Sequence, residues 1–219
     1  MTLPASFRSH RMVPSLMSTL DHGGPTIPTI LPIVFKLGRS LDLSDLLNFV
    51  VDPIVKLFPN QDRVVRMALL EALPEFIDKL DTKVVSERIW PHLQGGFADT
   101  TPVLREATVR SVLHLYSKLS GRILNNELLR HLAKMQLDTE ASIRTNTCIL
   151  IGRLAPSLAS NTRRKVVAAA FAKALKDTFV HARVAALTAF MANIEYFEPE
   201  DIATKVLPVI VTTLIDQEK

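Results

Sequence analysis

The sequence repeats itself with a period of 39 residues, and this period restricts the chain to architectures built from stacked, similar units. An acidic or amide residue returns at one place in each interval, at Asp21, Asn60, Asp99, Asp138, Asp177 and Asp216. An arginine follows six residues later, at Arg66, Arg105, Arg144 and Arg183, with Ile27 as the exception. Apolar residues recur in the same phase, for example at Leu80, Leu119 and Leu158. We therefore interpret the chain as a repeat protein.

Each repeat unit is predicted to be a pair of helices. In the third unit, apolar residues have helical spacing at Val85, Ile89 and Leu93. Thr101 followed by Pro102 is typical of an N-cap and a first-turn proline, and it should begin the second helix of that unit. The expected first helices lie near 9–20, 45–58, 83–97, 123–136, 162–176 and 200–215. The expected second helices lie near 26–39, 63–79, 102–118, 141–156 and 180–195.

The length of the unit selects the repeat class. HEAT and armadillo units have about this length, whereas TPR and ankyrin units have only about 33 or 34 residues. We predict an all-α fold, an α-solenoid or superhelix of about five and a half HEAT repeats, because one helix pair cannot bury both of its faces. Residues 1–219 are expected to form a single HEAT-repeat domain. Its units are predicted at 9–41, 42–80, 81–119, 120–158, 159–197 and 198–219, the last being half a unit.

The recurring charges predict a structural ladder along the solenoid. Each arginine should reach carboxylates of its own unit and of the neighbouring unit, and such bonds can be bidentate. The ladder residues are Asn60, Arg66, Asp99, Arg105, Asp138, Arg144, Asp177 and Arg183. Seen alone, Asp99 and Arg105 resemble a catalytic or ligand-binding pair. Their place in the register favours a structural role.

Both ends of the chain depart from the pattern. The last helix stops where a partner helix should follow, so we expect a fragment of a longer protein. Its apolar end face is a candidate for oligomerisation. Near the other end, Pro25, Pro28 and Pro32 lie in the first of the second helices, and we expect that helix to be irregular or kinked.

The motifs argue against an enzyme. With only 7 glycines, phosphate-cradling loops are disfavoured, and no P-loop, G-x-S-x-G, H-E-x-x-H or protein-kinase motif occurs. The single cysteine, Cys148, falls in an apolar column and is expected to be a buried thiol in a reducing compartment. His92 and His131 occupy equivalent places in successive units, but no further zinc ligand joins them in the register. We predict no catalytic residue, no metal and no cofactor.

No apolar run reaches the roughly 18 to 20 residues that a membrane-spanning helix needs. The N-terminus lacks the apolar core of a signal peptide. A soluble, cytoplasmic protein is the expectation.

The surface offers candidate partner-binding residues. The net charge of +4 is too small by itself to indicate a nucleic-acid binder. Arg110, His114 and Lys118 follow one another at four-residue spacing on a second helix, and Arg153 is equivalent to His114 one unit later. This basic stripe suits an acidic peptide or a phosphate backbone, and a solvated helix face is the alternative. The basic run at 163–165 is expected to be exposed surface.

Several segments resemble the HEAT region of the Scy-like proteins, also called N-terminal kinase-like proteins. The resemblance covers roughly residues 28–219. It is carried by Trp90, Pro91, His92, Gly96, Phe97, Asp99, Thr100, Arg105, Asn146, Thr147, Gly152, Thr162 and Arg163. Members of this family carry a catalytically inactive kinase-like domain, HEAT repeats and a variable tail. The resemblance implies that only the middle scaffold is present here, without the kinase-like domain and the basic C-terminal tail.

The same resemblance implies a function. It indicates a non-catalytic protein-interaction scaffold in COPI-linked Golgi-to-ER retrograde vesicle traffic, with coat or trafficking factors as partners. The protein would be cytoplasmic and peripheral to Golgi or ER–Golgi membranes. The alternative is a tRNA-binding adaptor for nuclear tRNA export that uses a basic face of the solenoid.

Overall fold

The computed structural model describes residues 4, 7–21, 26–216 and 218. Pro25 and the side chain of Asp21, on which two expectations depend, lie outside the described residues. All regular elements in the described ranges are helical. None of these helices is long and apolar enough to cross a membrane. The chain divides into two compact units, Met1–Leu119 and Ser120–Lys219, and the division falls where the third predicted repeat ends.

The first unit contains the helices of the N-terminal repeats, in which labels beginning with η mark short 3-10 or π-helical segments. It begins with η1 (Arg8–Met12) and α2 (Val13–Asp21). The first helices of its next repeats are α4 (Leu43–Leu46), η2 (Leu47–Val51) and α5 (Asp52–Leu57), then α7 (Thr82–Val84), η5 (Val85–Ile89), α8 (Trp90–Leu93) and η6 (Gln94–Ala98). The second helices are α3 (Ile27–Gly38), α6 (Arg63–Ala72) with η3 (Leu73–Glu75) and η4 (Ile77–Lys79), and α9 (Pro102–Leu115) with η7 (Tyr116–Lys118).

The second unit continues the alternation. Its first helices are η8 (Ile123–Leu128) with α10 (Leu129–Met135), α12 (Ser160–Ala174), and the run of α14 (Pro199–Asp201), η11 (Ile202–Val206), α15 (Leu207–Val211) and η12 (Thr212–Ile215). Its second helices are α11 (Ala141–Leu154) with η9 (Ala155–Ser157) and α13 (Val180–Ala192) with η10 (Ile194–Tyr196). In both units these bounds lie within a few residues of the helices expected from the sequence.

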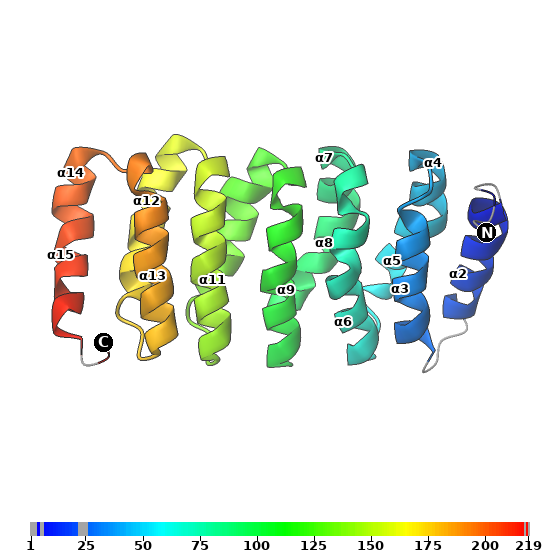
Figure 1. Ribbon diagram of the computed structural model, residues 1–219, viewed down its shortest axis with the longest axis horizontal. Helices are drawn as coiled ribbons and strands as arrows, with labels where there is room; N and C mark the ends of the chain where they lie inside the picture. Colours follow the sequence, from blue (N-terminus) through cyan, green and yellow to red (C-terminus); the bar gives the residue numbers. More distant parts are fainter. Residues whose placement is uncertain (1–3, 5–6, 22–25, 217, 219) are drawn as a thin grey trace. The chain divides into compact units, whose positions relative to one another are not determined.

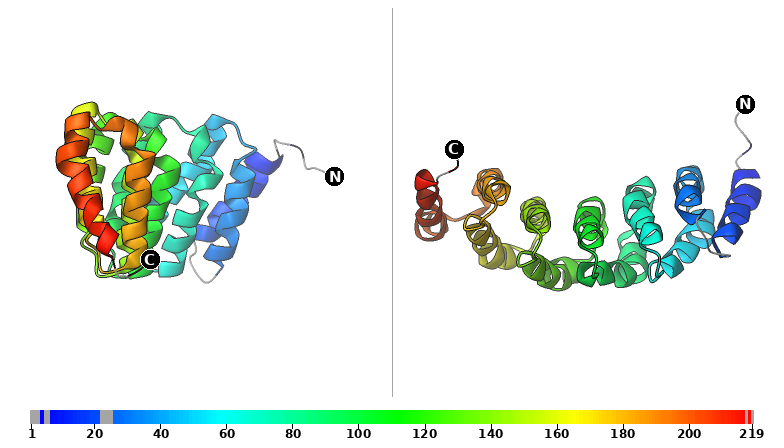
Figure 2. Two further views of the ribbon diagram at one scale, coloured as in Figure 1. Left: turned by 60° about the vertical axis from the view of Figure 1, so that its left-hand side comes forward. Right: turned by 90° about the horizontal axis from the view of Figure 1, so that it is seen from below.

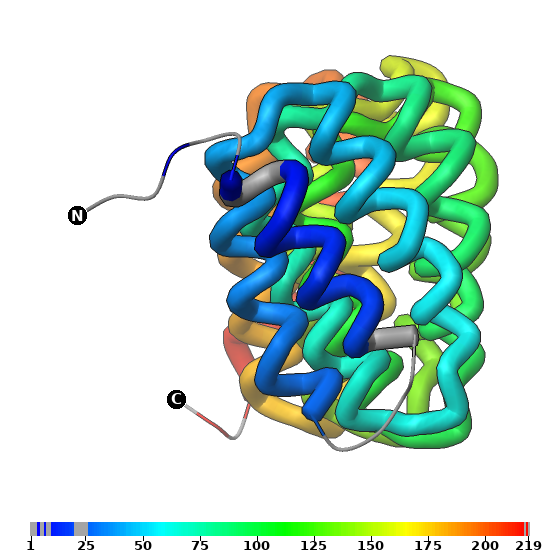
Figure 3. Tube along the Cα trace, turned by 90° about the vertical axis from the view of Figure 1, so that its right-hand side faces the viewer, coloured from blue at the N-terminus to red at the C-terminus, as the bar shows by residue number. Residues whose placement is uncertain are grey.

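Within each unit, the helices form two layers. In the first unit, α3, α6 and α9 lie side by side in one layer (Figure 1). Figure 3 looks at the same unit from its N-terminal end, with α3 on one side of α2 and the run from α4 to α5 on the other. In the second unit, α11 packs on α13 in one layer, and both contact α12 of the other layer (Figure 2).

The core lies between the layers and is built from the recurring apolar columns. Trp90 is 2% exposed, and Phe35 stacks on Phe76 with ring centroids 5.2 Å apart. In the second unit, Phe171 and Phe190 meet edge to face at 5.0 Å. Burying one such side chain stabilises the fold by about 1.5–3 kcal/mol, so each repeat is held mainly by these interlayer contacts.

Irregular turns occur where the first helices meet prolines, and not in the helix where they were expected. The described part of the proline-bearing second helix, α3, is one α-helix with Pro32 inside it. The π-helical segments η2, η5 and η11 instead end two residues before Pro53, Pro91 and Pro208. Proline has no N–H for an α-helical bond and its ring clashes with the carbonyl four residues earlier, so a wider π turn accommodates it. The π segment η1 likewise ends two residues before Pro14, whereas no proline follows η8.

The last helices leave apolar side chains exposed. Leu207 and Val211 of α15 are 50% and 56% exposed, and Leu214 and Ile215 are 82% and 86% exposed. The oligomerisation expected from an apolar end face stays a prediction.

A glycine pair in η6 gives a test of the packing between the layers. A Cβ atom on Gly96 would overlap the hydroxyl of Thr108, which is fully buried and donates to the Leu104 carbonyl at 2.7 Å. Gly96→Ala should therefore destabilise the chain by about 1–3 kcal/mol, because the core cannot take the extra atom. At Gly95 a Cβ meets nothing within 4 Å, so Gly95→Ala should be neutral or stabilise by about 0.4–1 kcal/mol. Urea denaturation of both variants measures the difference, and equal midpoints would contradict it.

Candidate functional site: the Arg–Asp ladder and the helix faces beside it

Each repeat turn is closed by the recurring acidic or amide side chain. Its Oδ1 atom accepts the backbone N–H of the residue two positions later, which fixes the chain at the turn before the second helix. These bonds join Asn60 to Asp62 (2.8 Å), Asp99 to Thr101 (2.8 Å), Asp138 to Glu140 (3.0 Å), Asp177 to Phe179 (2.9 Å) and Asp216 to Glu218 (3.1 Å). The residue at these positions therefore needs, first of all, a side-chain oxygen that can accept this N–H.

The recurring arginine binds the same turn through its backbone. One guanidinium nitrogen, Nη1, donates to two successive carbonyl oxygens five and six residues earlier in the chain. These bonds join Arg66 to Asn60 (2.5 Å) and Gln61 (3.0 Å), Arg105 to Asp99 (2.9 Å) and Thr100 (3.4 Å), Arg144 to Asp138 (2.9 Å) and Thr139 (3.1 Å), and Arg183 to Asp177 (3.1 Å) and Thr178 (3.2 Å). Each arginine therefore anchors its own turn to the start of its own second helix.

The rest of the guanidinium reaches the acidic residue of the next repeat, 33 positions later. In the first unit, Arg66 Nη2 donates to Asp99 Oδ2 at 2.9 Å. In the second unit the contact is bidentate, at 2.6 and 2.8 Å from Arg144 to Asp177 and at 2.5 and 2.7 Å from Arg183 to Asp216. We call these three arginine–aspartate pairs the Arg–Asp ladder.

Two of the ladder carboxylates, Asp177 and Asp216, are held ionised by their arginine partners. The Asp177 side chain is only 10% exposed. The hydrogen bond from Arg144 lowers the pKa of Asp177 below its ordinary value, although burial acts in the opposite direction. The hydrogen bond from Arg183 likewise lowers the pKa of Asp216. Such a carboxylate accepts from arginine and is not poised to take up a proton near neutral pH, so it is poorly suited to general acid–base chemistry.

The exceptions in the two columns explain each other. Asn60 stands where the later repeats have aspartate, and Ile27 stands 33 residues before it, where the later repeats have arginine. Asn60 still supplies the Oδ1 acceptor for Asp62, which the turn requires. No guanidinium comes from position 27, so the second oxygen of a carboxylate has no ladder partner there. An amide is therefore sufficient.

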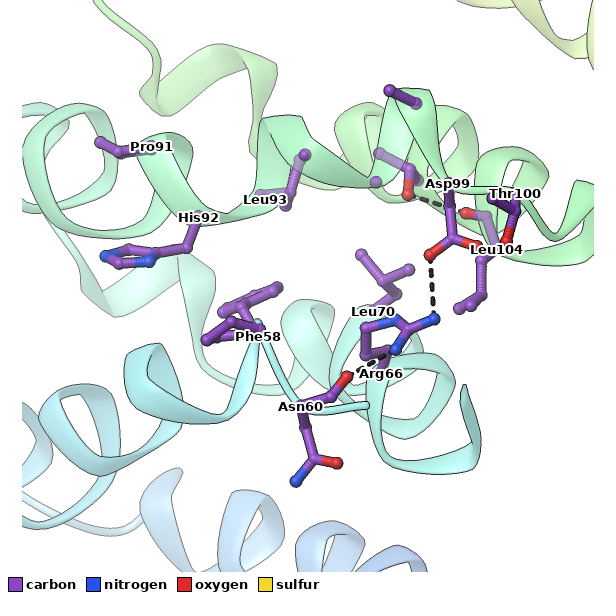
Figure 4. Close-up of a pocket in the computed structure, with 15 residues that line it drawn as sticks. Phe58, Asn60, Arg66, Leu70, Pro91, His92, Leu93, Asp99, Thr100 and Leu104 are labelled. Carbon is purple, nitrogen blue, oxygen red and sulfur yellow. Dashed lines mark hydrogen bonds and ion pairs between the residues drawn. The ribbon is translucent and has the colours of Figure 1, made fainter. Parts of the chain in front are cut away.

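A hollow of about 540 Å³ opens beside the Arg66–Asp99 pair (Figure 4). Phe58, Leu93 and the ring of His92 contribute to its walls. Gly95, which also lines the hollow, has no side chain to fill it. The equivalent positions in other repeats, 56, 134 and 173, hold lysine. The pair itself is satisfied within the fold. No group of three side chains that could hold a metal ion occurs among the residues the structure describes.

The predicted basic stripe is distributed over different environments. Arg110 and His114 are exposed and line a hollow of about 310 Å³ between α6 and α9, which they share with Glu71 and Glu106. Lys118 is half-buried, and its ammonium donates to the Asp78 carbonyl at 3.0 Å. Arg153 lies exposed on α11 in the second unit. Acidic side chains thus border the stripe, and one of its cations already binds the backbone.

The second-helix face of the first unit carries a groove that sequence reasoning did not identify. A further hollow of about 480 Å³ lies between α3 and α6, lined in part by Pro28, Pro32 and Val64. Met67 and Glu71 of α6 line both this hollow and the one between α6 and α9. The two hollows are therefore adjacent across α6, and we call them together the α6 groove.

Residues 163–165 were expected to be exposed surface. Arg164 and Lys165 are exposed, whereas Arg163 is half-buried, with its guanidinium 4.4 Å from the centre of the Tyr196 ring. Arg164 pairs at 3.0 Å with Asp201, whose side chain is 5% exposed. Thr101 does occupy the N-cap position before Pro102, but its buried hydroxyl makes no capping bond and has no partner in the described part of the chain. The Asp99 carboxylate accepts the N–H of Thr101 itself, which closes the turn but is not a capping bond to the helix.

Cys148 and His131 are not placed for catalysis. Cys148 is fully buried, and burial raises the pKa of its thiol to about 12, so the thiolate is scarce at neutral pH. Burial also lowers the pKa of His131, which favours a neutral imidazole. A buried, protonated thiol is a packing group and not an activated nucleophile.

Comparison with known proteins identifies the family of this scaffold. No protein-family model matches the chain. It is 35% identical over 217 residues to a Dictyostelium discoideum protein named probable inactive serine/threonine-protein kinase scy1, covering 99% of this chain and 26% of that protein. It is 37% identical over 211 residues to Cytoplasmic export protein 1 of Saccharomyces cerevisiae, covering 95% of this chain and 26% of that protein. The chain is homologous to the HEAT-repeat region of the Scy1-like pseudokinases.

Solved structures agree with this assignment. The crystal structure of Cex1p is similar to this chain, with a TM-score of 0.81 and 34% sequence identity. The match covers 97% of this chain and 40% of the Cex1p chain. A designed armadillo repeat protein matches 94% of both chains with a TM-score of 0.65 at 14% identity, which supports the fold alone. The predicted all-α solenoid of the HEAT and armadillo class and the resemblance to the Scy-like family are confirmed. The chain spans about a quarter of the length of its curated Scy1-like relatives.

Two residues that carried the Scy1-like resemblance have structural explanations. Trp90 is 2% exposed and lies 6.2 Å from the ring of Phe97. Gly152 lies where α11 approaches α13, because a Cβ there would come within 3.3 Å of the Ala189 side chain. These positions report the packing of the scaffold and are not candidates for contact with a partner.

The Arg–Asp ladder generates a stability prediction. Arg144→Ala should lower the free energy of unfolding by about 1–3 kcal/mol, because it leaves Asp177 and two carbonyl oxygens without their donor. Arg153→Ala is the matched control, since Arg153 is exposed and has no polar partner among the described residues. It should change stability by less than about 0.5 kcal/mol. Urea denaturation measures both, and an unchanged midpoint for Arg144→Ala would remove the ladder as a source of stability.

Proposed function

We propose that the chain is a non-catalytic protein-interaction scaffold of the Scy1-like type, acting in COPI-linked retrograde vesicle traffic from the Golgi to the ER. The α6 groove carries the proposal, because it is a continuous, partly apolar surface in which the exposed Glu71 has no polar partner among the described residues. Homology to a protein named a probable inactive kinase supports a role without catalysis. The trafficking role comes from the family resemblance, and so does a location in the cytoplasm beside Golgi or ER–Golgi membranes.

The groove has the properties of a peptide-binding surface. Val64 and Val103 are 57% and 60% exposed, and each lines one of the two hollows. Glu71 is exposed between them and has no polar partner among the described residues. Apolar contacts flanking one free carboxylate can bind a partner segment and select its register. Designed armadillo proteins of the same fold are described as made for modular peptide recognition.

The scaffold proposal is tested by capture from cytosol with the full 219-residue chain. We expect subunits of the COPI coat or other Golgi-trafficking proteins to be enriched, as measured by quantitative mass spectrometry. Glu71→Arg should reduce this enrichment at least about fivefold, because it reverses the charge at the centre of the α6 groove. Glu87→Arg is the control, since Glu87 is equally exposed but belongs to η5 in the other layer. Recovery of no trafficking protein would reject the proposal, and equal loss with both variants would reject the groove.

The alternative proposal is an adaptor for nuclear tRNA export. It is favoured by the name of the yeast relative, Cytoplasmic export protein 1, and by the free cations of the basic stripe, Arg110 and Arg153. Against it, Lys118 is already bonded and Glu71 and Glu106 lie in the same hollow as Arg110.

Binding of total tRNA at different salt concentrations tests the alternative. If the stripe contacts phosphates, affinity should fall steeply between about 50 and 200 mM salt, and Arg110→Glu should weaken binding. Arg63→Glu, at an exposed residue in the first turn of α6, is the matched charge control. Affinity that does not depend on salt, or that falls equally in both variants, would exclude the stripe as a tRNA site.

A further inference from the structure

The first-helix layer of the second unit contains a hollow of about 640 Å³ between α12 and the run from α14 to α15. It is lined by Asn161, Arg164, Lys165, Ala168, Ala169, Ala172 and Lys205. It is separate from the α6 groove, which belongs to the first unit and to the second-helix layer. Neither the ladder nor the core explains why these residue types should meet here.

One buried carboxylate organises the cations of this hollow. Asp201 is 4% exposed, and it accepts from Arg164 Nε at 3.0 Å and from Lys205 Nζ at 2.5 Å. The hydrogen bond from Lys205, assisted by that from Arg164, lowers the pKa of Asp201 and keeps it ionised. Two cations are therefore held in place by a single negative charge. Their side chains remain 46% and 55% exposed, so both can contact a second anion.

Further positive charge on the same helices is not neutralised. Lys165 lines the hollow, is exposed and has no polar partner among the described residues. Exposed lysines without described partners follow at Lys134 of α10 and Lys173 of α12. Glu200, which is next to Asp201 in the sequence, does not line the hollow. Arg164, Lys165 and Lys205 therefore give the hollow three cations against the one carboxylate of Asp201, and this excess of positive charge attracts an anionic partner.

The repeat itself does not require these cations. The residues 39 positions before Arg164 and Lys165 are Asn125 and Asn126. Asn125 performs a packing task, since its Oδ1 atom accepts the Ala159 N–H at 2.8 Å. The basic pair is thus a departure from the periodic pattern at one repeat only, as is expected of a residue set that serves binding and not the stacking of repeats.

The alanine floor decides which kind of anion fits. Ala168, Ala169 and Ala172 form an apolar base that lets a side chain or a partner backbone approach α12 closely. No aromatic side chain lines the hollow on which a nucleic-acid base could stack. A partner segment with carboxylates beside aliphatic side chains fits both the cations at the edge of the hollow and the alanines at its base. A phosphate group without an apolar neighbour fits only the cations.

We propose that this hollow docks an acidic, amphipathic segment of a partner protein, with aliphatic side chains on the alanine floor and carboxylates on Arg164, Lys165 and Lys205. The proposal rests on the proposed scaffold function and adds a second contact surface to it. Carboxylates of the segment accept the N–H groups that Asp201 leaves free on Arg164 and Lys205. The partner therefore completes an ion cluster that the fold has already positioned.

The test measures fluorescence anisotropy of a labelled peptide of about 16 residues, rich in Glu and Leu, with the full-length chain. A matched peptide with Gln in place of Glu, and a labelled single-stranded RNA of about 20 nucleotides, are the comparison probes. Lys165→Glu should weaken binding of the acidic peptide about tenfold or more, because it reverses a rim charge. Ala169→Trp, at an exposed position on the floor, should do the same by filling the hollow without a change of charge.

Lys83→Glu is the control, because Lys83 is an exposed residue on α7 of the first unit and undergoes the same change of charge. It should change affinity less than about twofold. The proposal would be overturned if the Gln peptide bound as tightly as the Glu peptide. It would also be overturned if Lys83→Glu weakened binding of the acidic peptide as much as Lys165→Glu does. A Lys165→Glu variant that lost affinity for the RNA but not for the acidic peptide would overturn it as well. If the peptide fails to bind while the wild-type chain captures trafficking proteins, only this hollow is rejected. If the peptide binds but no trafficking protein is captured, the trafficking role fails and the hollow stands.

Discussion

The order of the repeats depends on the hydrogen bonds that the guanidinium of the recurring arginine donates. This guanidinium satisfies two carbonyl oxygens of its own turn and the carboxylate of the next turn, so one side chain fixes both local geometry and contact between repeats. Buried or half-buried arginine is costly unless its donors are paired, and here the pairing is nearly complete. Burial of the apolar columns supplies the larger share of the stabilisation, but apolar residues would still pack if one repeat shifted along its neighbour. Such a shift would break the hydrogen bonds of the ladder, because their donors and acceptors have fixed positions.

The periodic sequence contains enough information to predict the ladder columns and the helix pairs, because both recur in one phase. Asp99 could be predicted to lie in the column, and the Thr-Pro pair after it predicted a capping hydroxyl at Thr101. The structure shows instead that Asp99 accepts the Thr101 N–H, and Asn60 accepts the Asp62 N–H in the same way without an arginine at position 27. The turn is therefore a local feature of the repeat, whereas the bond from Arg66 to the other oxygen of Asp99 depends on a residue 33 positions away.

Charged residues outside the register were the hardest to interpret. Lys118 was expected to belong to a binding stripe, and Arg164 to the exposed surface. In the structure, the first binds a carbonyl oxygen 40 residues away and the second a buried carboxylate 37 residues away. Both partners come from the adjacent repeat. The lysine contact occurs in two successive repeats, since Lys79 donates to the Arg39 carbonyl one period earlier. Sequence periodicity can predict contacts that most repeats make, whereas contacts made in one or two repeats depend on packing. The α6 groove and the basic hollow of the second unit belong to this second class.

The exchange of Asp for Asn at position 60, matched by isoleucine at position 27, has a consequence for how such a chain can change length. Each rung is divided between two successive units, with the cation in one and the anion in the next. Loss or duplication of one whole period after Asn60 would keep the spacing of 33 residues between each guanidinium and the next carboxylate. An insertion of any other length between an arginine and the next aspartate would separate them and leave a desolvated charge. The ladder therefore restricts changes of length within these repeats to whole periods.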